Sequence, residues 1–287
     1  MAKDIILKNK YLEVKITDCG AEMTSVCDSE NVQYIHQKNP STWDGQAPVL
    51  FPVCGHMAKK QIVVDKKIYD IPLHGFAKDS VFEVLSQSEC EAEFLLVSNE
   101  QTRKMYPYDF SFLIGYRLEK RRLEITYEVT NEGEKDMFFS IGSHEGYVLK
   151  DGLDGCEIIF EKKEEKPYYF EEHSYDFDGF SHSGTNAVLE LCGKLFEESK
   201  TIVFEKIKSD SAVLKDNSGK TLARIEFGGF DNLFIWTCPN SDFICIEPWC
   251  GMAEYDILPE DISLKPYIQK LKSKERFKRK HAITFGE

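Results

Sequence analysis

Glu247 is the only charged residue in the run F-I-C-I-E-P-W-C-G, residues 243–251. Burying a carboxylate among apolar side chains is costly unless other groups stabilise it, so its position points to a chemical role. Pro248 follows and favours extended backbone at the residue before it. The sequence therefore predicts a glutamate that is buried, held in one backbone conformation and directed at a defined point.

Two histidines follow apolar, strand-like runs. His144 lies in F-F-S-I-G-S-H-E-G-Y between Gly142 and Gly146, and His74 lies in I-P-L-H-G-F-A-K-D-S just before Gly75. Glycine permits the tight backbone turns that bring a side chain at a strand end into a site. No role is assigned to the histidines in polar or loop-like contexts: His36, His173, His182 and His281.

Glu247, His144 and His74 together could perform general acid–base catalysis, because a carboxylate can accept a proton and an imidazole can donate one near neutral pH. Two histidines and an acid could also bind a metal ion, and an isolated histidine is often a hydrogen-bonded structural residue. Spacing along the chain does not decide between these roles. Trp236 and Trp249 would suit a sugar, whose apolar faces pack on aromatic rings, although plain core packing is the alternative.

Composition and motifs exclude several functional classes. The P-loop, the dinucleotide fingerprint, the G-x-S-x-G elbow and H-E-x-x-H are all absent. A net charge of −13 disfavours nucleic acid as a partner. Nine cysteines without C-x-x-C or zinc-ligand spacing are expected to be reduced and structural, with no metal. The chain has no apolar run of membrane-spanning length and no signal core, so we expect a cytoplasmic protein without a membrane partner.

The elements that must position these residues are strands. Apolar and polar residues alternate over 11–17 and 123–129, the second ending in a turn at 131–133. Hairpins are predicted over 61–71, turning at 65–67, and over 211–227, turning at 216–219. Short helical signals occur only at 193–198 and 266–271. The acidic stretch 161–178 is expected to be a long loop or edge strand, and the basic stretch 270–280 a solvated segment.

We therefore predict an all-β fold, a large antiparallel β-sandwich forming a single domain over residues 1–287. No internal repeat, linker or low-complexity tract divides the chain. The length of 287 residues favours a large two-sheet sandwich over a small barrel.

Six blocks, taken in order, resemble the aldose 1-epimerase (galactose mutarotase) family, and more narrowly its shorter bacterial branch. The resemblance covers nearly the whole chain. The blocks are D-C-G-A-E-M-T-S-V (18–26), P-S-T-W-D-G-Q-A-P-V-L-F-P-V-C-G (40–55), P-L-H-G-F-A-K-D (72–79), Y-P-Y-D-F (106–110), I-G-S-H-E-G-Y (141–147) and C-I-E-P-W-C-G (245–251).

The resemblance implies a β-supersandwich that interconverts the α and β anomers of an aldose, without a cofactor. Glu247 would be the base that removes the proton of the anomeric hydroxyl, and His144 the acid that protonates the ring oxygen. His74 would bind and polarise the substrate. This chemistry needs Glu247 ionised while His144 is protonated, and an anionic pocket is expected to favour that state by raising the pKa of the histidine. Trp249 is expected to contact the sugar, and the protein to be a monomer or homodimer.

The chain departs from the family pattern around the substrate. His56 stands where the family commonly has arginine, Lys78 replaces the arginine of the H-G-F-A block, and Glu145 replaces a proline. Near residue 195, where the bacterial branch often has an aspartate, the candidates are Ser199 and Lys200. His56 and Lys78 are the expected substrate-binding residues, and the sugar stays undetermined. Two alternatives stay open: a non-catalytic carbohydrate-binding or regulatory sandwich, and a hexose-phosphate mutarotase, which needs basic side chains around a phosphate.

Overall fold

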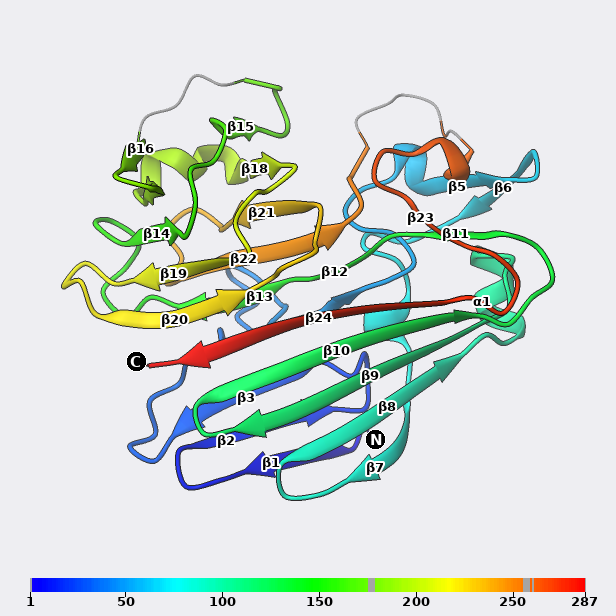
Figure 1. Cartoon of the computed structure of the whole chain (residues 1–287), viewed down its shortest axis with the longest axis horizontal. Coiled ribbons are helices and arrows are strands. Elements are labelled where there is room, and N and C mark those ends of the chain that lie inside the picture. The colour runs from blue at the N-terminus through cyan, green and yellow to red at the C-terminus, as the bar shows by residue number, and fades with distance from the viewer. Residues whose placement is uncertain (1, 175–178, 255–258, 260, 287) are drawn as a thin grey trace.

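Two large antiparallel sheets dominate the fold. The computed structural model describes residues 2–174, 179–254, 259 and 261–286. One sheet has ten strands in the order β16-β17-β14-β19-β20-β24-β10-β9-β8-β7, and the other has seven, in the order β15-β18-β21-β22-β12-β4 with β13 also paired to β22. Figure 1 shows the larger sheet curving from β14 and β19 through β24 to β7. The predicted antiparallel sandwich is confirmed.

The ten-stranded sheet comprises β7 (Glu83–Gln87), β8 (Glu91–Val97), β9 (Phe110–Glu119), β10 (Arg122–Asn131), β14 (Glu157–Phe160), β16 (Phe180–Ser183), β17 (Asn186–Glu190), β19 (Ser211–Lys215), β20 (Thr221–Glu226) and β24 (Arg276–Phe285). The seven-stranded sheet comprises β4 (Val49–Leu50), β12 (Ile141–Ser143), β13 (Glu145–Val148), β15 (Tyr168–Tyr169), β18 (Ile202–Glu205), β21 (Asn232–Trp236) and β22 (Phe243–Cys250).

Three smaller sheets complete the strands: β1 (Asp4–Lys8), β2 (Leu12–Thr17) and β3 (Met23–Asp28); β5 (Gln61–Val64) and β6 (Lys67–Asp70); and β11 (Met137–Phe139) and β23 (Gln269–Leu271). The described helices are α1 (Glu100–Met105) and short 3-10 helices at Ala58–Lys60, Ala77–Asp79, Gly193–Ser199 and Ile262–Leu264. No helix among the described residues has the length and apolar character needed to cross a membrane.

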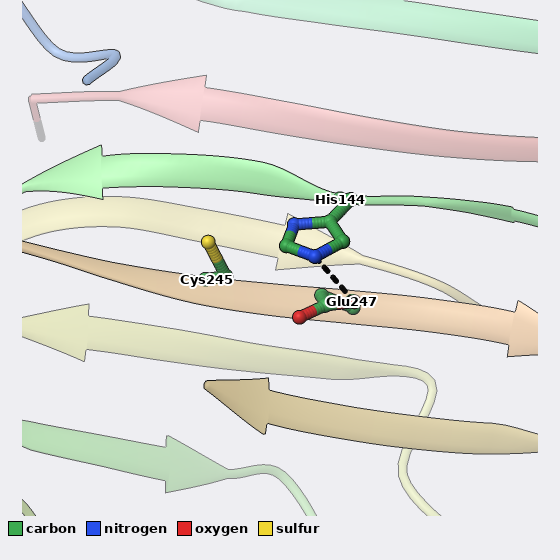
Figure 2. A group of neighbouring side chains, drawn as sticks. All are labelled: His144, Cys245 and Glu247. Carbon is green, nitrogen blue, oxygen red and sulfur yellow. Dashed lines mark ion pairs between the residues drawn. The ribbon is translucent and has the colours of Figure 1, made fainter. Parts of the chain in front are cut away.

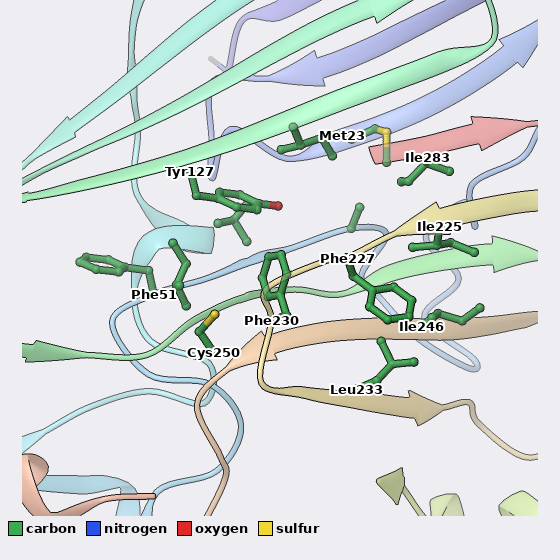
Figure 3. Close-up of a cluster of buried hydrophobic side chains, with 14 of the residues drawn as sticks. Met23, Phe51, Tyr127, Ile225, Phe227, Phe230, Leu233, Ile246, Cys250 and Ile283 are labelled. Carbon is green, nitrogen blue, oxygen red and sulfur yellow. The ribbon is translucent and has the colours of Figure 1, made fainter. Parts of the chain in front are cut away.

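The core lies between the two large sheets. Apolar residues of β20 and β22, such as Ile225 and Ile246, are fully buried and point towards one another from opposite sheets (Figure 3). Phe227 and Phe230, just after β20, fill the space between them. Period-two alternation in β10 sends its apolar residues into this core, as the sequence predicted.

Both predicted hairpins are confirmed, as β5–β6 and β19–β20. The helical signal at 193–198 corresponds to a 3-10 helix, but the one at 266–271 is wrong because its second half forms β23. The basic stretch is also no solvated tail: it enters β24, a central strand between β20 and β10. Arg276, Lys278 and Lys280 point outwards, where Glu128 and Glu124 pair with them, whereas Arg279 faces the inner side near Cys250. The acidic stretch contains β15, and residues 175–178 lie outside the described part.

Candidate active site

A pocket of about 590 Å³ opens on the seven-stranded sheet. It contains all six residues that the sequence predicted for the site: Glu247, His144, His74, His56, Lys78 and Trp249. Residues separated by most of the chain therefore meet in one place. Its remaining lining is Glu22, Lys38, Trp43, Asp44, Gly45, Pro48, Gly55, Leu73, Asp79, Phe170, Glu171, Thr201, Phe234, Trp236 and Ala253.

Glu247 and His144 face each other across neighbouring strands. Glu247 lies in β22, and its Oε2 is 3.4 Å from Nε2 of His144 (Figure 2). His144 occupies the single residue between β12 and β13, where the ladder along β22 is interrupted. Pro248 lies opposite this interruption, which fits because proline lacks the N–H that a continuous ladder would use. The chain thus places the imidazole beside the carboxylate at a break in the ladder.

The glycines around His144 make room for tryptophans. A Cβ on Gly142 would lie 2.6 Å from Cδ1 of Trp249, and one on Gly146 would lie 2.9 Å from Cζ3 of Trp43. The Trp43 ring stacks on the His144 imidazole with centroids 5.0 Å apart. These glycines are therefore required by close packing of aromatic rings, and the rings in turn fix the orientation of His144.

His74 enters the pocket from a strained turn. Its φ is 62°, and Gly75 follows with a φ of 75°. The Gly55 N–H donates to Nδ1 of His74 at 3.0 Å, so the neutral imidazole carries its proton on Nε2. The rings of His74 and His144 are 5.2 Å apart. Burial, followed by the charges of His144 and Lys78, holds the pKa of His74 well below its usual value, so His74 is a neutral hydrogen-bond donor.

Burial controls the acid–base pair. It raises the pKa of Glu247 well above its usual value, aided by the negative charge of Glu145. It lowers the pKa of His144 to about 4. The expectation that an anionic pocket raises the histidine pKa is therefore wrong: loss of water outweighs the nearby charge. Burial thus favours the uncharged form of both groups, a protonated Glu247 beside a neutral His144.

The expected substrate-binding residues differ in what they can offer. His56 is exposed at the pocket edge, and its carbonyl accepts from the N–H of Glu254. Lys78 donates to Asp79 at 2.5 Å, so its charge is already paired. Trp249 is buried, stacks on Phe234 at 3.7 Å and has no hydrogen-bond partner for Nε1 among the described residues.

The far wall of the pocket was not predicted. Thr201 donates through its hydroxyl to Glu171 at 2.7 Å, and both residues line the pocket. Lys200, considered in place of an aspartate, pairs with Glu172 instead and does not line the pocket, and the Ser199 side chain lies outside the described part. Neither Glu171 nor Thr201 stands out in the sequence, because each lies in a stretch without a clear period.

Trp43 was also not singled out, although its ring stacks on His144. It lies within one of the resemblance blocks, so its aromatic type in a loop was the available signal. Glu22 accepts from the N–H groups of Gln46 and Ala47 at 3.2 and 3.0 Å. It thereby holds the loop that carries Trp43.

The metal-ligand set weighed from the sequence, two histidines and an acid, does not assemble. The described residues that group together are His144, Cys245 and Glu247, with ligand atoms within 4.8 Å of one another. Cys245 is fully buried, which raises the pKa of its thiol well above the usual value. A protonated thiol is a small hydrophobe rather than a ligand, so we assign no metal here.

Comparisons with known proteins find relatives over nearly the whole chain. The chain is 29% identical to the LacX protein encoded on the Lactococcus lactis chromosome, over 98% of both chains. It superposes on a galactose mutarotase related enzyme from Lactobacillus acidophilus with a TM-score of 0.89 and 27% identity, covering 99% of this chain and 98% of that one. A galactose 1-epimerase from Lactobacillus acidophilus NCFM shares the fold, with a TM-score of 0.64, 16% identity and coverage of 100% and 95%. The aldose 1-epimerase family model matches residues 3–250, and the chain therefore belongs to the aldose 1-epimerase family, as an isomerase of the mutarotase type.

Proposed function

We propose that this protein interconverts the α and β anomers of an unphosphorylated aldose, with Glu247 as base and His144 as acid. The observation that carries the proposal is the 3.4 Å approach of Glu247 Oε2 to His144 Nε2 inside a pocket with aromatic walls. The anomeric hydroxyl and the ring oxygen are bonded to the same carbon. An acid and a base that serve them must therefore lie close together, as these two atoms do.

The proposed reaction moves one proton in each direction. Glu247 removes the proton of the anomeric hydroxyl while His144 protonates the ring oxygen, and the bond between the ring oxygen and the anomeric carbon breaks. The aldehyde end rotates, and the reverse transfers close the other anomer. Sugar hydroxyls that donate to Glu247 favour its ionised form, which shifts the proton of the resting pair to His144 when substrate binds.

The charge of the pocket favours a neutral sugar over a hexose phosphate. Besides the catalytic Glu247, four carboxylates line it, those of Glu22, Asp44, Asp79 and Glu171, against two lysines. Both lysines already face carboxylates: Lys78 binds Asp79 at 2.5 Å, and Lys38 lies 3.7 Å from Glu22. A phosphate needs free cationic donors, so the phosphate-binding alternative lacks support. The names of the relatives make galactose the first sugar to test, with its epimer glucose beside it.

Polarimetry of freshly dissolved α-galactose and α-glucose, corrected for the spontaneous rate, tests the proposal. We expect Glu247→Gln to lower the catalysed rate about 10²–10⁴-fold, the usual contribution of a placed acid or base. Glu164→Gln is the matched control, because Glu164 is also a buried carboxylate but accepts from Lys208 and Ser209, away from the pocket. A wild-type protein that binds these sugars without accelerating either, or any of a panel of aldoses, would instead be a carbohydrate-binding module.

A further inference from the structure

A second buried glutamate–histidine pair lies directly behind the first. Glu145 follows His144 in the chain, and strand alternation sends its side chain to the other face of the sheet, into the sandwich. There its Oε1 lies 3.4 Å from Nε2 of His281, which belongs to β24 in the opposite sheet. The two residues are 2% and 1% exposed, so the pair bridges the two sheets through the core.

The surroundings of this pair are polar but incompletely hydrogen-bonded. Ser143 donates to Oε2 of Glu145 at 2.9 Å. The hydroxyls of Tyr127 and Tyr147 and both ring nitrogens of His281 are buried with no hydrogen-bond partner among the described residues. A buried pair of ionisable groups whose neighbours lack hydrogen-bond partners is a poor stabilising device, and apolar residues of equal volume would usually serve stability as well. The arrangement therefore calls for a role other than holding the sheets together.

The pair is coupled to Glu247 through the strand register. Glu145 is paired with Ile246, the residue before Glu247, and Gly146 with Cys245. The charge of Glu145 is, after burial, the leading cause that raises the pKa of Glu247. Burial raises the pKa of Glu145 itself to about 7 and lowers that of His281 to about 3, so the pair changes charge near neutral pH. The titratable or polar groups whose electrostatics involve Glu145 are Ser143 of β12, Tyr147 of β13, Tyr116 of β9, Tyr127 of β10, His281 of β24, and Cys245 and Glu247 of β22.

We propose that Glu145 and His281 are positioning residues for the catalytic pair: their contact across the core fixes the β12–β13 junction that carries His144, and it holds the Glu145 carboxyl behind Glu247 on the other face of the sheet. This inference rests on the proposed roles of Glu247 and His144. It accounts for a glutamate at the position where the family resemblance leads one to expect proline. It also gives His281, which the sequence left without a role, a function inside the core.

The test is a titration of the Glu247 side chain that needs no turnover. The protein is labelled with ¹³C-glutamate, and the Glu247 carboxyl signal is assigned from its loss in Glu247→Gln. We expect Glu145→Gln to move the midpoint of this titration to lower pH by roughly half to one unit, because a nearby negative charge is removed. His281→Gln keeps a polar N–H group beside Glu145 and should leave the midpoint closer to wild type than His281→Leu, which removes it.

Glu164→Gln, another buried carboxylate away from the pocket, should not move the midpoint. An unchanged Glu247 midpoint in a folded Glu145→Gln protein would overturn the inference, as would an equal shift in Glu164→Gln. Catalysis gives a second reading, because kcat in Glu145→Gln should fall several-fold on the alkaline side with little change in KM. Failure of the wild-type protein to accelerate any aldose would refute the proposed function alone, since the carboxyl titration is read without a sugar.

Discussion

At the scale of single residues, the site holds a carboxyl group in a buried position, where its ionised form is unfavourable but where the reaction needs a base. Glu247 is 2% exposed, and burial raises its pKa well above the usual value. A base that is poorly solvated binds a proton readily, which suits removal of a hydroxyl proton. The same burial disfavours the ionised side chain in the folded protein, so activity and stability compete at this position.

Glu247→Gln should therefore stabilise the protein increasingly as the pH rises. The raised pKa means that the contribution of Glu247 to stability is present below the usual carboxyl pKa and is lost as pH rises through the folded-state pKa. This loss of stability amounts to at most about 1.4 kcal/mol for each pH unit between the usual carboxyl pKa and the raised pKa in the folded protein. Thermal unfolding of both proteins at pH 5 and pH 9 measures the effect. A stability difference between Glu247→Gln and the wild type that becomes smaller from pH 5 to pH 9 would contradict the prediction.

The pH dependence of the rate should follow the one-proton state of the catalytic pair. Below about pH 4, His144 is protonated as well as Glu247, so the pair holds two protons. Above the raised pKa of Glu247, the pair holds none. We expect the catalysed rate to be highest between these limits and to fall on both sides. Stopped-flow polarimetry, corrected for the spontaneous reaction at each pH, gives the profile. If the fall in rate at alkaline pH keeps the same midpoint in a still-active His144→Gln protein, that fall does not report the protonation state of the pair.

At the scale of elements, the turn that delivers His74 depends on one glycine. A Cβ on Gly75 would lie 2.1 Å from the carbonyl oxygen of Phe51, at a φ of 75°. Gly75→Ala should cost about 1–3 kcal/mol in unfolding free energy and raise KM, because His74 moves with the turn. Gly184→Ala is the control: its φ is 63°, but nothing lies within 4 Å, so it should cost about 1 kcal/mol and leave KM unchanged. Equal KM values in the two variants would argue against a substrate-contacting role for His74.

The sequence predicted elements correctly where neighbouring residues carry the pattern, and it failed where only the tertiary fold brings residues together. β10 and both hairpins follow from alternation and turn residues, and the site followed from Glu247, His144 and His74 in recognisable blocks. Glu171 and Thr201 could not be predicted, because only the tertiary fold brings them to the pocket. His281 was misread because charged neighbours made β24 look solvated, whereas only its outward face is.

At the scale of the whole molecule, we infer that residues 1–287 form one domain, because one cluster of buried apolar residues runs from Ile5 in the first strand to Phe285 in the last. β24 is central to this unity. It pairs with β10 over Arg122–Thr130 and with β20 over Ala223–Glu226. A strand that joins two halves of a sheet cannot be removed without exposing two open edges and the core beneath them.

Deleting residues 276–287 should therefore abolish folding, measured as loss of soluble protein and of a cooperative thermal transition. The double variant Lys278→Gln/Lys280→Gln removes two positive charges of β24 while keeping the strand itself. These lysines lie 3.5 and 2.7 Å from Glu128 and Glu124 on the exposed face, where each ion pair is worth less than about 1 kcal/mol. The double variant should fold and keep its activity. A soluble, cooperative truncated protein would instead mean that the basic stretch is dispensable, and that the ten-stranded sheet closes without its central strand.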